Sequence, residues 1–140
     1  MKIWRNNLPH LNAVITGTGS YLPEQVLTNH DLAQKIETSD EWIHSRTGIR
    51  SRHISGEAES NNFMSAQAAQ RALDCAGVTP NEIDLIIVAT VSGTYSFPST
   101  ACFIQQALGV PAGAAAFDLQ GACSGFVYGL QMADAQIKTG

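Results

Sequence analysis

A continuous apolar run in the second half of the chain sets the tightest limit on its fold. Residues 83–91 read Ile-Asp-Leu-Ile-Ile-Val-Ala-Thr-Val and follow the turn-forming pair Thr79 and Pro80. This run is too short for a typical helix and is rich in β-branched residues, so it predicts a strand that is buried on both faces. Such strands belong to sheets that helices cover from both sides. We therefore expect a layered α/β fold.

Segments with strand and helix patterns alternate around this run, and most of the helices carry start and stop signals. Further strands are expected at residues 13–16 and 114–119. Thr28 is expected to cap a helix with its body at residues 31–36, and Thr38 has capping-box spacing for a second helix that Gly48 ends. Further helices are expected at residues 60–76, 99–108 and 124–138, and the last of them carries an apolar face made by Phe126, Leu130, Ala133 and Ile137. The Gly-Thr-Gly at residues 17–19 lacks the third glycine of a dinucleotide loop, so a tight strand exit is favoured over a phosphate cradle. No linker or repeat interrupts the pattern, and we interpret residues 1–11 as an arm and residues 12–140 as one domain.

Composition excludes several classes of protein. The 140 residues are 44% hydrophobic and only 14% charged, with a formal net charge of −4. Without a basic stripe, a signal peptide or an apolar stretch of about 18 residues, we expect a cytoplasmic protein that binds neither nucleic acid nor a membrane. The low charge suggests that a partner or missing sequence covers part of the surface. Three widely spaced cysteines argue against a disulfide framework and a zinc site, and Cys75 and Cys102 are expected to be small core residues.

Cys123 is the strongest candidate for a catalytic residue. It lies between the strand expected at residues 114–119 and the helix expected at residues 124–138. At the start of a helix, backbone N–H groups and the positive end of the helix dipole stabilise a thiolate. Because the thiolate is the nucleophilic form of cysteine, this placement predicts a nucleophile.

Three motifs together resemble one enzyme family. They are TSDEWIHSRTGIRSRHI at residues 38–54, FPSTAC at residues 97–102 and DLQGACSGF at residues 118–126. All three resemble β-ketoacyl-acyl carrier protein synthase III, the condensing enzyme that starts bacterial type II fatty acid synthesis. The resemblance extends over nearly the whole chain but covers a little under half of a typical family member. It implies the N-terminal half of a thiolase-like fold, layered α/β with a mixed sheet, truncated before its last strand.

The resemblance also implies site residues and partners. Cys123 matches the cysteine that takes an acetyl group from acetyl-CoA before condensation with malonyl-acyl carrier protein. Thr38, Trp42 and Arg46 match residues at the adenine end of coenzyme A. Phe97 matches an aromatic residue at the dimer contact that reaches the partner's acyl pocket, since the family works as a homodimer. No metal and no cofactor are implied, and acetyl-CoA is a substrate.

The chemistry of these residue types fits the implied roles. Trp42 offers a flat face to a purine, and Arg46, one turn later, can stack or meet a phosphate, although partial burial of Trp42 in the core is the alternative. The backbone N–H of Cys123 can serve as an oxyanion donor. For Arg50 and Arg52 the sequence is neutral between a solvated edge and a role in guiding phosphopantetheine.

The resemblance also limits what this chain does alone. Condensation in the family depends on a histidine and an asparagine in its second half, and neither has a counterpart here. None of the histidines present is expected to be catalytic, namely His10, His30, His44 and His53. We therefore expect the isolated 140-residue chain to be inactive in condensation. Two alternatives stay open: a non-catalytic thiolase-like module that pairs with another chain, and a related thiolase-superfamily enzyme that condenses acyl-CoA.

Overall fold

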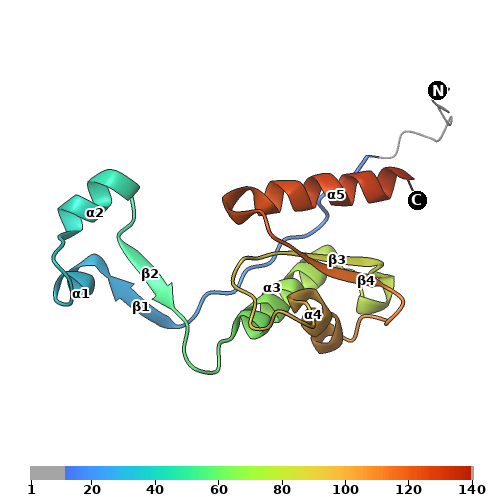
Figure 1. Cartoon of the computed structure of the whole chain (residues 1–140), viewed down its shortest axis with the longest axis horizontal. Helices are drawn as coiled ribbons and strands as arrows, with labels where there is room; N and C mark the ends of the chain where they lie inside the picture. The colour runs from blue at the N-terminus through green and yellow to red at the C-terminus, as the bar shows by residue number, and fades with distance from the viewer. Residues whose placement is uncertain (1–11, 140) are drawn as a thin grey trace.

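The computed structural model describes residues 12–139, which form two lobes (Figure 1). The small lobe holds β1 (Gln25–Thr28), α1 (Asn29–Ala33), α2 (Asp40–Thr47) and β2 (Ser51–Ile54). The large lobe holds α3 (Asn61–Ala76), β3 (Leu85–Ala89), α4 (Thr100–Leu108), β4 (Ala115–Leu119) and α5 (Gly125–Thr139). Short 3-10 turns precede β3 at Pro80–Glu82 and α5 at Ala122–Ser124. The arm expected at residues 1–11 lies outside the described residues.

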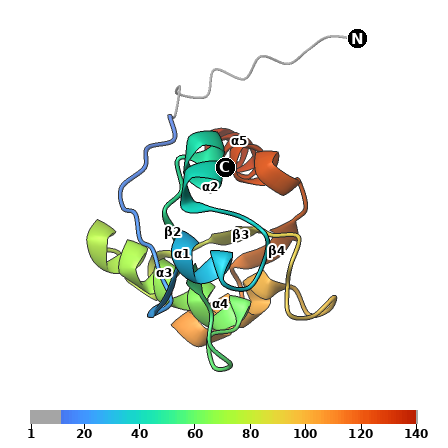
Figure 2. The same cartoon turned by 90° about the vertical axis from the view of Figure 1, so that its left-hand side faces the viewer.

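The large lobe has the layered α/β arrangement that the sequence predicts. Strands β3 and β4 are parallel, with Leu85 opposite Ala115 and Ala89 opposite Leu119. Helices α3 and α4 lie on one side of this strand pair and α5 lies on the other (Figures 1 and 2). Parallel neighbours need a crossover connection, which α4 supplies between β3 and β4. The carboxyl ends of both strands therefore meet at one edge.

Side-chain caps and glycines define the ends of α3 and α4, as expected. Ser60 and Ser99 accept a hydrogen bond from the backbone N–H three residues later. Gly77 and Gly109 end these helices at φ of 66° and 72°, in the left-handed region that favours glycine. Among residues 12–139, no helix combines the length and the apolar character that a membrane crossing requires.

The prediction that β3 is buried on both faces is wrong. Within residues 12–139 its only partner strand is β4, and four of its five residues are half-buried. A groove of about 720 Å³ is lined by residues of the strand pair and of α5, among them Ile87, Phe117 and Leu130. The face of α5 that the sequence assigns to the core lines this groove, yet Phe126 on it is 68% exposed. Helix α5 approaches β3 closely only at its glycines, Gly125 beside Ala89 and Gly129 beside Ile87, among the described residues.

Residues 13–16 do not form the expected strand. Val14 and Ile15 are 75% and 70% exposed, and no strand pairs with this segment among the described residues. The glycines that follow it explain why: a Cβ at Gly19 would lie 2.2 Å from the backbone oxygen of Ala68 in α3, and one at Gly17 would lie 2.5 Å from that of Ala72. Close backbone approach to a helix, rather than sheet pairing, holds the segment.

The small lobe contains an antiparallel strand pair that the sequence did not reveal. Gln25 lies opposite Ile54 and Thr28 lies opposite Ser51. Each strand has four residues and is mostly exposed, so neither carries a periodic apolar pattern. Thr28 also caps α1, as expected, through a capping box with Asp31.

Two smaller expectations are corrected. Ser39, not Thr38, caps α2, because its hydroxyl accepts from the N–H of Trp42. Cys75 is exposed rather than a core residue, because it lies about 200° around α3 from the buried Leu73. Cys102 is half-buried.

Candidate functional site

Cys123 lies in a 3-10 turn between the carboxyl end of β4 and the first residue of α5. Its side chain is exposed. The turn is closed by the N–H of Ser124, which donates to the carbonyl of Gly121 at 3.0 Å. The placement of Cys123 at the start of the last helix is therefore confirmed, with a short turn between the thiol and α5 proper. Open parallel sheets commonly bind ligands at the carboxyl edge of their strands, which is where this thiol lies.

Tight backbone packing fixes the turn around Cys123. A Cβ at Gly121 would lie 2.8 Å from the Cα of Gly125, so the chain folds back on itself within five residues. Gly125 is buried against Ala89 of β3. Ala122 has φ of 45°, the only positive φ of a non-glycine residue among residues 12–139. The residue just before the thiol is thus held in a conformation that L-amino acids rarely adopt.

Asp118 connects the strand that leads to Cys123 with the start of α4. Its two carboxylate oxygens accept from the N–H groups of Thr100 at 2.7 Å and Ala101 at 2.9 Å. A carboxylate at this position satisfies orphan donors and the positive end of the helix dipole. This role of Asp118 was not predicted, although an acidic residue within an apolar strand is a usable signal, since buried carboxylates need partners.

Phe97 lies in the loop that precedes α4. Its side chain is 88% exposed, and Val91 and Tyr95 of the same loop are also exposed. A cluster of exposed apolar side chains is typical of a surface that another molecule covers. The role of Phe97 at a dimer contact stays a prediction.

The three residues expected at the adenine end of coenzyme A lie on or beside α2. The guanidinium carbon of Arg46 lies 4.5 Å from the centroid of the Trp42 ring, a cation–π contact across one turn. Trp42 is 53% exposed, so about half of its surface is open to solvent, which argues against the alternative of partial burial in the core. Thr38 is half-buried two residues before α2 begins. The structure therefore brings Trp42 and Arg46 into contact on an exposed helix face.

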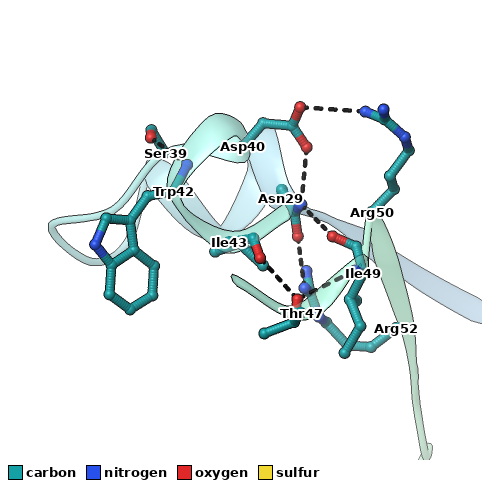
Figure 3. Close-up of polar contacts among 9 residues, drawn as sticks. All are labelled: Asn29, Ser39, Asp40, Trp42, Ile43, Thr47, Ile49, Arg50 and Arg52. Atoms are coloured by element: carbon teal, nitrogen blue, oxygen red, sulfur yellow. Dashed lines mark hydrogen bonds and ion pairs between the residues drawn. The ribbon is translucent and has the colours of Figure 1, made fainter. Parts of the chain in front are cut away.

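Asn29 organises the polar contacts below α2 (Figure 3). It is fully buried, with 0% exposure, at the first position of α1. Its amide nitrogen donates to Asp40 Oδ1 and to the carbonyl of Ile49, both at 2.8 Å. Its amide oxygen accepts from Arg52 at 2.6 Å. No pattern in the sequence pointed to Asn29, because its partners are brought to it only by the fold.

Arg50 and Arg52, for which two roles were open, both make contacts within the small lobe. Arg50 lies 3.4 Å from Asp40 Oδ2 and is largely exposed. Arg52 donates to Asn29 and to the carbonyl of Leu27. The amide of Asn29, and next the charge of Arg50, hold the pKa of Asp40 below its usual range, against the opposing effect of partial desolvation. These contacts favour a structural role for Arg52 over a role in binding phosphopantetheine.

The candidate residues thus form two groups on different lobes. Trp42 and Arg46 belong to the small lobe, and Cys123 belongs to the large lobe. Helix α5 begins at the end of the large lobe that faces the small lobe (Figure 1). Within residues 12–139, no three His, Cys, Asp or Glu side chains are grouped as metal ligands would be.

Known proteins are similar to this chain over most of its length. A family model described as 3-Oxoacyl-[acyl-carrier-protein (ACP)] synthase III matches residues 117–140, which include Cys123. Beta-ketoacyl-[acyl-carrier-protein] synthase III of Neisseria meningitidis is 57% identical over 128 residues, which cover 91% of this chain and 40% of the relative. The chain is thus similar in sequence to part of synthase III. It spans about 40% of the length of such curated relatives.

Solved structures of synthase III relatives share the fold. The enzyme of Aquifex aeolicus superposes with a TM-score of 0.85 at 51% identity, over 89% of this chain and 40% of that one. The priming β-ketosynthase from the R1128 polyketide pathway has a TM-score of 0.85 at 37% identity, over 93% of this chain and 40% of that one. The recognition from three sequence motifs and the expected fold class are therefore confirmed.

Proposed function

We propose that this chain is the acyl-accepting part of a β-ketoacyl-acyl carrier protein synthase III. The whole protein would start fatty acid synthesis by condensing acetyl-CoA with malonyl-acyl carrier protein. The observation that carries the proposal is Cys123: an exposed thiol at the carboxyl edge of a parallel strand pair, inside the segment that matches the family model.

The first half-reaction is a thioester exchange at Cys123. Its sulfur attacks the carbonyl carbon of the acyl-CoA, and a new carbon–sulfur bond forms as the bond to coenzyme A breaks. The coenzyme A thiolate leaves and takes up a proton, so no oxidant, metal or cofactor is needed. The backbone N–H of Cys123 is our candidate donor to the carbonyl oxygen as that oxygen gains negative charge.

The nucleotide end of coenzyme A would bind on α2. Arg46 already covers one part of the Trp42 ring, and the half-exposed indole leaves surface on which an adenine can stack. The guanidinium is also suited to a phosphate, which it can bind through two parallel N–H groups. Thr38, just before α2, is our third candidate at this end of the substrate.

The remaining assignments concern partners of the whole protein. Malonyl-acyl carrier protein would supply the second carbon unit, and two copies of the whole protein would pair through the loop that carries Phe97. The support within this chain is the exposed apolar surface of that loop.

Acylation of the whole protein tests the proposal. Incubation with acetyl-CoA should add one acetyl group to the protein, as measured by intact mass, and Cys123→Ala should abolish the addition. Cys75→Ala is the matched control, because Cys75 is also an exposed thiol and should be dispensable. An unmodified wild-type protein, or acetylation that survives in Cys123→Ala, would contradict the proposal and favour a non-catalytic module.

A related condensing enzyme with another primer is the second candidate. The 37% identity to a priming ketosynthase of a polyketide pathway supports it, while the 57% identity to synthase III favours the first candidate. Acylation of Cys123 by acetyl-CoA in competition with longer or branched acyl-CoA thioesters would separate the two.

A further inference from the structure

We propose that Asn29 is a positioning residue for the nucleotide end of the acyl-CoA substrate, acting through α2. This inference rests on the function proposed above. It adds a residue that the three family motifs do not contain, since Asn29 precedes the first of them, and it is argued from the hydrogen bonds in Figure 3.

Helix α2 needs contacts outside itself to fix its position on the protein. It has eight residues, and Ile43 is the only one of them that is buried. Isolated helices shorter than about 12 residues are marginal in water, and little apolar area is buried here to compensate. The cap at Ser39 and the left-handed Gly48 satisfy backbone groups at the two ends, but they act within the helix and its own flanks.

The side-chain amide of Asn29 tethers α2 at both ends. One hydrogen bond reaches Asp40, the first residue of the helix, and the other reaches the carbonyl of Ile49, two residues beyond its last. The Ile49 N–H in turn donates to the hydroxyl of Thr47, which donates to the carbonyl of Ile43 inside the helix. A single buried amide is thus linked to the start, the interior and the exit of α2.

The same residue anchors these tethers to the strand pair. Its amide oxygen accepts from Arg52 of β2, which also donates to the carbonyl of Leu27 in β1. Its backbone N–H donates to the carbonyl of Arg50 at 3.0 Å. Because Asn29 is fully buried and its amide serves as donor and acceptor at once, neither a hydrophobic residue nor a carboxylate can reproduce the arrangement.

Trp42 and Arg46 lie between the two tethered ends, one helical turn apart. Any rotation or slide of α2 moves the indole and the guanidinium together relative to the rest of the protein. Binding groups that are misplaced by about 1 Å can cost a large part of a ligand's productive binding. Loss of Asn29 should therefore weaken the nucleotide contacts without altering the thiol, which lies on the other lobe.

The experiment compares two thioesters in the whole protein. Acetyl-CoA and acetyl-pantetheine carry the same reacting group, but only the first has the nucleotide. In Asn29→Ala and Asn29→Asp, we expect the acetyl-CoA concentration for half-maximal acylation of Cys123 to rise about tenfold, as loss of about one buried hydrogen bond predicts. The maximal rate and the acylation by acetyl-pantetheine should stay within about twofold of wild type.

Controls and a double variant distinguish positioning from general damage. Asn81→Ala and Asn81→Asp make the same changes at an exposed residue of the large lobe and should leave both thioesters unaffected. The effect of Asn29→Ala on acylation by acetyl-CoA should be smaller in a Trp42→Ala background than in wild type, because the part of it that acts through Trp42 is already lost.

Two results would overturn the inference. One is an equal fall in acylation of Cys123 by acetyl-CoA and by acetyl-pantetheine, in Asn29→Ala and also in the shape-conserving Asn29→Asp. The other is an acetyl-CoA concentration for half-maximal acylation that both variants leave unchanged. Failure of the proposed function is separate, because it would show as a wild-type protein that neither thioester acylates.

Discussion

Replacement of Asp118 by asparagine should destabilise the protein strongly, although the two side chains have the same shape. The carboxylate accepts from two adjacent backbone N–H groups at 2.7 and 2.9 Å at the start of α4. Hydrogen bonds to a charged group contribute about 1.5–3 kcal/mol each. The amide keeps one acceptor, now uncharged, and turns its own N–H toward the other backbone donor, so that one bond is lost and the second is weakened.

The expected cost of Asp118→Asn is about 3 kcal/mol, with loss of the favourable charge at the helix N-terminus contributing up to about 1 kcal/mol of it. Asp134→Asn is the matched control. Asp134 pairs with Lys138 at 2.7 Å across one turn of α5, and both side chains are exposed enough for water to screen the pair. Such pairs contribute about 0.3–0.5 kcal/mol.

Urea denaturation of the whole protein and both variants measures the difference. Asp118→Asn should lower the transition midpoint with little change in its denaturant dependence, and Asp134→Asn should barely move it. If the two substitutions cost the same, the two bonds at α4 do not stabilise the fold and the reasoning is refuted.

Three further outcomes follow from the structure. Gly19→Ala should lower the free energy of unfolding by about 1–3 kcal/mol, because its Cβ would meet a backbone oxygen of α3 at 2.2 Å, whereas Gly113→Ala, which meets nothing within 4 Å, should be neutral. Gly121→Ala should slow acylation of Cys123 by acetyl-CoA, since its Cβ would lie 2.8 Å from the first residue of α5 and displace the turn that holds the thiol. Expressed as free energies, the loss in acylation rate should exceed the loss in the free energy of unfolding. The pKa of Asp40 is lowered in the folded state, so its charge stabilises the fold above the unfolded value of about 4 and this contribution disappears as pH falls through the lower folded value. Denaturant titrations from pH 6 down should therefore show a smaller loss of stability below about pH 4 in Asp40→Asn than in wild type.

Local signals were enough to predict most of the large lobe. Serines and glycines placed α3 and α4 because capping is decided within one turn of chain, and an apolar run placed β3. The thiol was located for the same reason, since strand, turn and helix follow one another directly around Cys123.

Contacts between segments that are distant in the sequence could not be predicted from local sequence patterns. The expected strand at residues 13–16 had the right composition, yet the glycines after it serve a close approach to α3 instead. Asn29 and Asp118 matter through partners as many as 23 residues away, and no periodicity encodes such a pairing. The incomplete burial of β3 and the exposed apolar side chains of α5 also escaped prediction, because burial depends on what lies opposite an element as well as on its own side chains.

The positive φ of Ala122 has a consequence for how this protein can evolve. Glycine at this position would relieve the backbone strain without a steric clash, so selection for greater stability would favour Ala122→Gly. The same change would widen the range of conformations open to the peptide that carries the nucleophile. Alanine at this position thus lowers the stability of the fold slightly and narrows the range of positions that the thiol occupies. Ala122→Gly should therefore yield a more stable protein in which Cys123 is acylated more slowly.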